Sequence, residues 1–394
     1  MKTKPKNRFR SCFLTVFLIF SGLCILLLGI SAISNLLLPS RAVNTEILTN
    51  LDKARLTEAN HLRQTLGESV WPGFGEANIP IIIYNKHYAF LVGIKDPESG
   101  WTKVPVNEQR GDAWEVVPDD TFEGKPYFRQ SLSDLNVTPE AFTVLVGNQW
   151  VASITTRDWT EIGLVEPILE DFPSWLHPIL PYKLFIRAML GDSDRYISLI
   201  QHESFHAFEG ETAYALLEAA ENANHNYGEK YPWDSSELQE DWKTEIDFLV
   251  KAVRCPSEGE TVELVRQFLA QREQRRSDNG LSAGMVDYER LRELEEGLAK
   301  YVQIRSLLQA AASSDYIPTV EMELDGDFNY YSTAEKFLKL EISNTKTGSE
   351  DSRLYYTGMG QALLLDRLMP NWKGRVFQEG ITLEGLLRFA ISHP

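Results

Sequence analysis

The stretch from Ser11 to Ser40 contains no charged residue. A membrane-spanning helix needs about 20 apolar residues, and this stretch exceeds both that length and the apolar core of a typical signal peptide. Basic residues precede it, which favours a cytoplasmic N-terminus; they are Lys2, Lys4, Lys6, Arg8 and Arg10. We therefore predict a single-pass membrane protein in which residues 1–41 form a basic head and a signal anchor, with the remaining chain outside the cytoplasm.

Small residues near the end of this stretch leave a second localisation open. Ser31, Ala32 and Ser34 lie where a signal peptidase could cut, which would release a secreted protein. Cysteine usage does not decide between the two, because Cys255 is the one cysteine beyond the apolar stretch and no disulfide can form within the external part.

The distribution of charge excludes one class of partner. Residues 1–41 hold six basic and no acidic side chains, whereas residues 42–394 hold 33 basic and 56 acidic side chains, a net charge of −23. Because nucleic-acid binding depends on a basic surface, we expect no nucleic-acid partner. The predicted partners are a peptide or protein substrate and the membrane, through the N-terminal helix.

A short motif in the second half of the chain has the pattern H-E-x-x-H, over His202, Glu203 and His206. Two histidines four residues apart project from one face of a helix, so both imidazoles can bind one metal ion. Zinc suits such a site because it accepts neutral imidazole nitrogen and can leave one position for water. Glu203 could take a proton from that water, which ionises near neutral pH when zinc binds it.

The surroundings of the motif favour a helix rather than a chance match. Asp192 or Ser193 can cap a helix that begins after Gly191. Apolar residues then recur at a helical spacing; they are Tyr196, Ile197, Leu199, Ile200, Phe205 and Phe208. A surface helix that happens to carry two histidines is the alternative interpretation.

Zinc needs a third protein ligand, and Glu296 begins a stretch with the pattern E-G-x-A-x-Y that ends at Tyr301. Together the two motifs resemble those of the gluzincins, zinc metallopeptidases whose third ligand is a glutamate on a second helix. The resemblance implies that Glu296 binds the zinc. Glu293 and Glu295 are the alternative ligands, and a solvated glutamate in an acidic helix is the non-functional interpretation.

Two features depart from the pattern of thermolysin-like enzymes. The interval from His206 to Glu296 is 90 residues, which is longer than in those compact enzymes and is expected to contain two or three helices. Lys300 also stands where those enzymes carry an acidic residue, which leaves the partner that orients the first histidine unassigned.

A tyrosine near the C-terminus is a further candidate. Tyr355 and Gly358 match a Y-x-x-G segment of some gluzincins, in which the tyrosine hydroxyl donates to the developing oxyanion. The resemblance implies this role for Tyr355, with Tyr356 as the neighbour to test. A core tyrosine at the start of a helix is the alternative.

The external part divides by pattern into two regions. Residues 42–182 are expected to form a helical stem and an α+β region, with strands over 81–84 and 88–94 and a hairpin across Gly147 and Asn148. Residues 183–394 are expected to be mostly helical and to carry the zinc site. The predicted fold class is therefore α+β: an N-terminal transmembrane helix, a small mixed sheet, and a mostly helical, zincin-like half.

The sequence thus predicts a membrane-anchored zinc metallopeptidase that hydrolyses peptide bonds outside the cytoplasm. Because no G-x-M-E-N stretch of related aminopeptidases is present, we expect an endopeptidase. Two alternatives stay open: another zinc hydrolase on the same scaffold, and a non-catalytic, membrane-tethered binding module. An intramembrane protease is disfavoured, because Gln201, Glu209 and Glu211 flank the motif with polar side chains.

Overall fold

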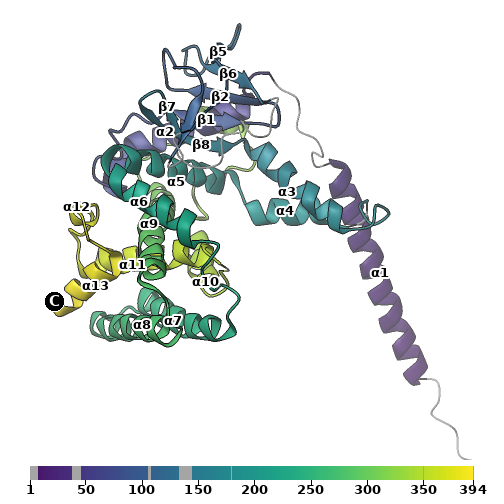
Figure 1. Cartoon of the computed structure of the whole chain (residues 1–394). Coiled ribbons are helices and arrows are strands. Elements are labelled where there is room, and N and C mark those ends of the chain that lie inside the picture. The colour runs from purple at the N-terminus through teal and green to yellow at the C-terminus, as the bar shows by residue number, and fades with distance from the viewer. Residues whose placement is uncertain are drawn as a thin grey trace, which may run out of the picture. The chain divides into compact units, whose positions relative to one another are not determined.

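The computed structural model describes residues 8–37, 46–104, 108–132, 144–178, 180–348 and 350–393 (Figure 1). Two compact units are present, one drawn from Met1–Thr45 and Thr155–Gly191, the other from Glu46–Ile154 and Asp192–Pro394. Helices and one sheet together confirm the α+β class. The division of the chain at residues 41 and 182 stays a prediction.

The described part of the first unit contains three helices, α1 (Arg8–Leu37), α3 (Arg157–Asp171) and α4 (Tyr182–Leu190). Within α1, Leu14–Leu36 is long and apolar enough to cross a membrane or to serve as a signal sequence. α4 packs against both α1 and α3. The backbone carbonyls of His177 and Leu180 accept hydrogen bonds from the Asn35 amide near the end of α1, at 3.1 and 2.7 Å.

The second unit contains an eight-stranded sheet with the order β4-β3-β7-β8-β1-β2-β6-β5. Its strands are β1 (Ile81–Tyr84), β2 (Tyr88–Val92), β3 (Trp101–Lys103), β4 (Glu108–Arg110), β5 (Glu115–Val116), β6 (Phe128–Ser131), β7 (Val144–Val146) and β8 (Gln149–Thr155). The expected strands near residues 81–84 and 88–94 are β1 and β2. The expected hairpin across Gly147 is formed by β7 and β8.

The sheet is larger than the small mixed sheet that the sequence predicted. It has eight strands, and the described pairs are antiparallel, for example Ile81 opposite Val92 and Val144 opposite Val151. The four additional strands, β3 to β6, contain two to four residues each, so they carry too little alternation to be recognised from the sequence.

Helices make up the rest of the second unit. α2 (Asn50–Val70) corresponds to the expected stem, of which residues 42–45 lie outside the described part. The others are α5 (Ser193–Thr212), α6 (Tyr214–Tyr227), α7 (Ser236–Arg254), α8 (Glu258–Asp278), α9 (Ala283–Ala312), the 3-10 helix η2 (Val320–Leu324), α10 (Ala334–Asn344), α11 (Ser352–Leu368), α12 (Lys373–Val376) and α13 (Leu383–Ser392). Helices α6, α7 and α8 fill the interval between the two motifs, as expected.

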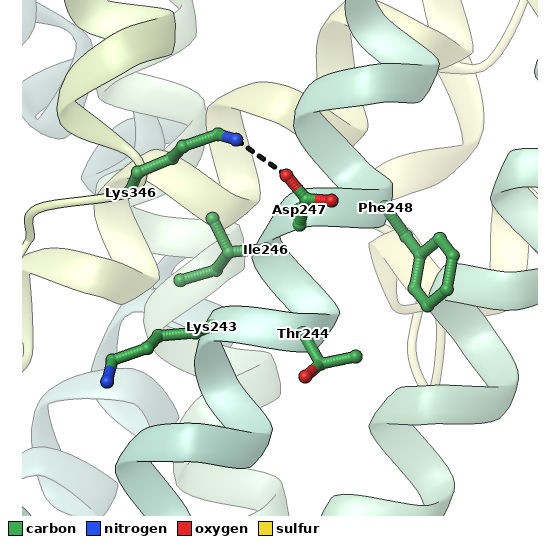
Figure 2. A pocket seen from close by; sticks show the side chains of 6 residues that line it. All are labelled: Lys243, Thr244, Ile246, Asp247, Phe248 and Lys346. Carbon is green, nitrogen blue, oxygen red and sulfur yellow. Dashed lines mark hydrogen bonds and ion pairs between the residues drawn. The ribbon is translucent and has the colours of Figure 1, made fainter.

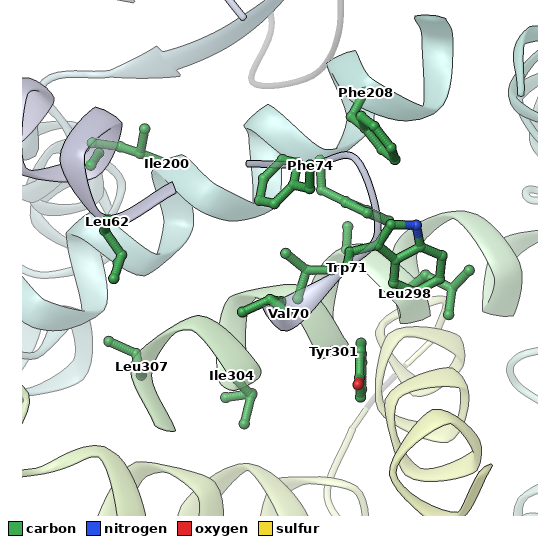
Figure 3. Close-up of a cluster of buried hydrophobic side chains, with 14 of the residues drawn as sticks. Leu62, Val70, Trp71, Phe74, Ile200, Phe208, Leu298, Tyr301, Ile304 and Leu307 are labelled. Atoms are coloured by element: carbon green, nitrogen blue, oxygen red, sulfur yellow. The ribbon is translucent and has the colours of Figure 1, made fainter. Parts of the chain in front are cut away.

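The apolar core joins α2, α5 and α9. Figure 3 shows side chains of these three helices directed into a shared interior, with Trp71 among them. Trp71 contacts Phe205 of α5 and Tyr301 of α9 edge-on, with ring centroids 4.9 and 6.3 Å apart. The core therefore holds the helix with the H-E-x-x-H motif against the helix that carries Glu296.

Candidate metal centre

Helix α5 presents the H-E-x-x-H motif as the sequence predicted. The Asp192 side chain caps its first turn by accepting a hydrogen bond from the Arg195 backbone amide at 3.1 Å. His202, Glu203 and His206 follow on the buried side of the helix. They keep little contact with solvent, because His202 is 7% and Glu203 is 9% exposed.

Glu296 lies on α9, which packs directly against α5 and α11. The backbones of α9 and α11 approach closely at two glycines: a Cβ on Gly297 would lie 2.5 Å from Gly358 Cα. No larger residue fits at this crossing without displacing a helix. The crossing brings α11, and with it Tyr355, beside the Glu296 side chain.

Three donor atoms from these helices meet at one point. Nε2 of His202 lies 3.2 Å from Nε2 of His206 and 3.2 Å from Oε2 of Glu296. Nε2 of His206 lies 3.4 Å from the same Glu296 oxygen. The three buried side chains therefore form a group that can hold a metal ion.

The spacing of the donor atoms fits tetrahedral zinc. Zinc bonds to nitrogen and carboxylate oxygen measure about 2.0–2.2 Å, and tetrahedral ligands at the shorter end of this range lie about 3.3–3.4 Å apart. The observed 3.2–3.4 Å triangle matches one face of such a tetrahedron. The fourth corner of the tetrahedron would be available for water.

The outer nitrogen of His206 also has a partner that suits a metal ligand. Nδ1 of His206 lies 2.9 Å from Oε2 of Glu209, one turn further along α5. In a neutral imidazole, a proton on Nδ1 shared with this carboxylate leaves the Nε2 lone pair free for a metal. Nδ1 of His202, by contrast, has no hydrogen-bond partner among the described residues.

Arg292 contacts the second oxygen of Glu296. Its Nη2 lies 3.1 Å from Oε1 of Glu296, so only Oε2 of that carboxylate faces the histidines. Nη1 of Arg292 donates to Glu295 at 2.6 Å, and Nη2 also donates to the Tyr355 hydroxyl at 3.2 Å. One guanidinium therefore fixes Glu296 and Tyr355 together.

Tyr355 lies beside the donor atoms. Its ring stacks parallel to the His202 ring, with centroids 6.3 Å apart and planes 7° from parallel. Burial raises the pKa of the phenol, and the nearby Glu296 carboxylate raises it further, so Tyr355 keeps its proton. Tyr356 instead faces Lys300, whose ammonium lies 5.6 Å from the centre of its ring.

Burial and charge set the protonation of the remaining groups. Burial lowers the pKa of His202 to about 4 and raises the pKa of Glu203 to about 8. Burial would also lower the pKa of His206, but the Glu296 and Glu209 carboxylates outweigh it and raise that pKa well above its ordinary value. The negative charge that favours a proton on His206 favours a metal cation at the same point.

Glu296 and Glu209 complete this electrostatic arrangement. Burial would raise the pKa of Glu296, but Arg292 and His206 hold it well below its usual range, so the carboxylate is ionised. Burial raises the pKa of Glu209 to about 7, against the lowering effect of its contact with His206. An ionised carboxylate oxygen is one of the ligands that zinc accepts.

Two of these contacts were not foreseen from the sequence. Glu209 stands three residues after His206, and Arg292 stands four residues before Glu296; both spacings place side chains on one helical face. The acidic and basic residues around both motifs offered several such pairs, so spacing alone did not single these out. Lys300, which stands where thermolysin-like enzymes carry an acidic residue, pairs with Glu341 of α10.

Two hollows among the described residues of the second unit do not involve the donor atoms. One, of about 370 Å³, lies over α7, where Lys346 pairs with Asp247 at 2.6 Å (Figure 2). Another, of about 710 Å³, lies between α2 and the sheet and is lined by Arg63 and Tyr127 among others. The converging imidazoles and carboxylates therefore identify the candidate centre better than cavity size does.

Comparisons of the chain with protein-family models, curated proteins and solved structures found no match.

Proposed function

We propose that this chain is a zinc-dependent peptidase of gluzincin type, anchored in a membrane by α1 with its second unit outside the cytoplasm. The observation that carries the proposal is the triangle of donor atoms from His202, His206 and Glu296, with sides of 3.2–3.4 Å. Its two histidines and one glutamate form a donor set used by catalytic zinc, which retains a fourth position for water.

Glu203 supplies the base that hydrolysis needs. Bound zinc would acidify a coordinated water and polarise the carbonyl of the scissile bond. Within the described residues, Oε2 of Glu203 is buried without a hydrogen-bond partner. A zinc ion beside it would lower the raised pKa of this carboxyl, so that the ionised group could accept a proton from a water. Glu203 then returns this proton to the amine nitrogen that leaves when the bond breaks.

Tyr355 and Arg292 would act on the oxyanion side of the reaction. The Tyr355 hydroxyl accepts a hydrogen bond from Arg292 at 3.2 Å. Its own proton faces the Glu296 carboxylate in this structure, and once zinc holds that carboxylate the proton would donate to the oxygen of the attacked carbonyl. Arg292 keeps this hydroxyl and the Glu296 carboxylate in place. The donor geometry supports only the activation of water. The proposal that the bond cleaved is a peptide bond rests on the resemblance of the two motifs to those of gluzincins, and the proposal of endopeptidase action rests on the absence of a G-x-M-E-N stretch.

Metal content and hydrolysis test the proposal together. We expect purified wild-type chain to contain zinc in proportion to protein, and Glu296→Ala to lose most of it. Glu335→Ala, which changes an exposed glutamate at the start of α10, is the matched control and should keep its zinc. Zinc at the wild-type level in Glu296→Ala would move the third ligand to another residue.

The reaction itself is tested with a broad peptide library and mass spectrometry. Glu203→Gln should retain zinc while kcat falls by about 10²–10⁴-fold, because general-base catalysis contributes that much. Peptidase activity at the wild-type rate in Glu203→Gln would reject the mechanism. Zinc binding with hydrolysis of esters but not peptides would identify another zinc hydrolase, and zinc binding with no hydrolysis would favour a binding module.

A further inference from the structure

The first unit exposes a group of large apolar side chains around the connection between α3 and α4. Trp175 is 69% exposed, and Phe185 is 62% exposed. Phe172, Leu184 and Met189 are 44–52% exposed. We call Phe172–Leu190 the interfacial segment. Such a concentration of exposed aromatic and aliphatic side chains indicates an interaction surface.

The interfacial segment is attached to one end of the apolar helix. The Asn35 amide donates hydrogen bonds to the backbone carbonyls of His177, Pro178 and Leu180, at 3.1, 3.2 and 2.7 Å. α4 packs beside this end of α1, as Figure 1 shows. The exposed side chains therefore lie next to the point where Leu14–Leu36 ends.

The sequence of the segment fits a lipid headgroup region. Residues 172–182 contain no Asp, Glu, Lys or Arg, and Lys183 and Arg187 are the two charged residues of the whole segment. Apolar residues with a few basic ones are typical of helices that lie in the plane of a membrane surface. Tryptophan is enriched at this depth because its ring is apolar and its N–H is polar.

One face of α4 has the composition that membrane insertion requires. Leu184, Phe185, Ala188 and Met189 are all exposed, and at 100° per residue they share one continuous arc of the helix. Ile186, on the other side, is buried within the unit. The arc therefore carries no charged side chain, although its residues are exposed.

The length of α1 places this arc at the membrane boundary. The 23 residues from Leu14 to Leu36 extend about 34 Å, slightly more than the hydrocarbon thickness of about 30 Å. Asn35 lies in the last turn of that span, so the backbone that it holds lies at the edge of the hydrocarbon.

We propose that the interfacial segment inserts its exposed apolar side chains into the surface of the same bilayer that α1 spans. A bilayer is a better occupant than a second protein because α4, which carries the arc, packs against α1, and apolar residues near the end of α1, Ile33 and Leu36, are exposed as well. The segment thereby gives the chain a second contact with the membrane. The inference rests on α1 spanning a membrane and is independent of the peptidase activity.

Tryptophan fluorescence tests this inference on the full chain, because none of the nine tryptophans lies in α1. The chain is reconstituted into phosphatidylcholine vesicles whose acyl chains carry bromine near the headgroup or deep in the bilayer. Shallow bromines should quench part of the emission more than deep bromines do. Trp175→Phe should lose this quenched part, at most the share of one tryptophan in nine, whereas the control Trp114→Phe in the second unit should keep it.

A second pair of variants separates insertion from mere proximity. Phe185→Glu combined with Met189→Glu should reduce the quenching of Trp175, because charge opposes burial in lipid. Ile317→Glu combined with Val320→Glu places the same charges on exposed sites of the second unit and should leave quenching unchanged.

Flotation of the vesicles distinguishes the possible failures. Chain that does not float with vesicles would show that α1 is no anchor and would overturn both the anchoring and this inference. Chain that floats while wild type and Trp175→Phe are quenched equally would overturn the inference alone and would favour a protein partner, such as a second copy, on the exposed arc.

Discussion

Glu209 shows how a single side chain can tune the candidate metal centre. It contacts Nδ1 of His206, the nitrogen that faces away from the other donor atoms. A carboxylate there fixes the ring orientation and makes the other nitrogen a better metal ligand, and losing such a partner typically lowers metal affinity 10–100-fold.

We predict that Glu209→Gln lowers zinc affinity about 10- to 100-fold, because the amide keeps the shape of the side chain but loses its charge. Competition with a chromogenic chelator measures the affinity. Glu211→Gln is the matched control, since Glu211 lies on the same helix and is exposed. Equal affinities in the two variants would remove Glu209 from the metal centre.

A second prediction about a single residue concerns Arg292. Arg292→Lys offers one compact charge in place of a planar fork, so it cannot contact Glu295, Glu296 and Tyr355 together. We expect zinc affinity to fall about tenfold or more and kcat to fall as well, because the Tyr355 hydroxyl loses its partner.

Arg290→Lys serves as the control for this variant, because Arg290 lies on the same helix but pairs with Glu384. A general loss of stability would lower the temperature of unfolding without changing the zinc affinity of the folded chain. An Arg292→Lys variant with wild-type affinity and kcat would therefore show that Arg292 supports the fold alone.

The residues of the candidate metal centre differ in how directly the sequence predicts them. His202, Glu203 and His206 follow from helical spacing within five residues, which local structure guarantees. Glu296 required a motif resemblance, since α9 carries several glutamates and only its packing against α5 selects one. Arg292 contacts two glutamates of its own helix and Tyr355 of α11, so a local pattern could reveal only part of its role.

Long helices and apolar strands were predictable elements, whereas short strands were not. The interval between the motifs contains three helices as expected, and β1 and β2 are continuous apolar runs. β5 consists of two exposed residues, Glu115 and Val116, which have no strand pattern of their own. Lys103 pairs with Val144, which is 41 residues away in the sequence. The order of the strands in the sheet is therefore set by tertiary packing and not by local sequence.

The close crossing of α9 and α11 leads to a prediction about how these two helices pack. A Cβ on Gly358 would lie 2.4 Å from the Glu293 carbonyl oxygen and 2.7 Å from Gly297 Cα. Gly358→Ala must push α11 away from α9, and such overpacking costs about 1–3 kcal/mol. We expect that loss in the free energy of unfolding, together with weaker zinc binding.

Gly259→Ala is the control for this helix crossing. Gly259 lies in α8, and a Cβ there would meet nothing within 4 Å, so alanine should stabilise the helix by up to about 1 kcal/mol. Denaturant unfolding of both variants measures the difference. A Gly358→Ala variant as stable as wild type would mean that the two helices have room to separate.

A buried network of arginines and glutamates joins the helices of the second unit into one structure. Arg272 and Arg275 are fully buried and both pair with Glu245 of α7, at 2.7 and 2.6 Å. Arg272 also contacts Glu293 of α9, and Thr357 of α11 donates to the same carboxylate at 2.6 Å. Removing one partner from such a network leaves a buried charge unpaired, which costs about 3–5 kcal/mol.

Glu384 of α13 links this network to Arg276 and Arg290, each at 2.8 Å. Burial would raise the pKa of Glu384, but these arginines and Arg272 lower it from 4.5 to about 2. The unfolded chain therefore binds a proton at higher pH than the folded chain does. The stabilisation by Glu384 is complete above pH 4.5 and is lost as the pH falls toward 2.

We predict that Glu384→Gln lowers the free energy of unfolding by about 3–5 kcal/mol near pH 6, and that the gap to wild type narrows steadily between pH 4.5 and pH 2. Denaturant titrations of the chain in detergent across this range measure the gap. Glu273→Gln is the control, because it removes an exposed glutamate that pairs with Arg388 at 2.7 Å. It should lower the free energy of unfolding by at most about 1 kcal/mol. A Glu384→Gln gap that stays constant from pH 6 to pH 2 would show that the charge of Glu384 does not hold these helices together.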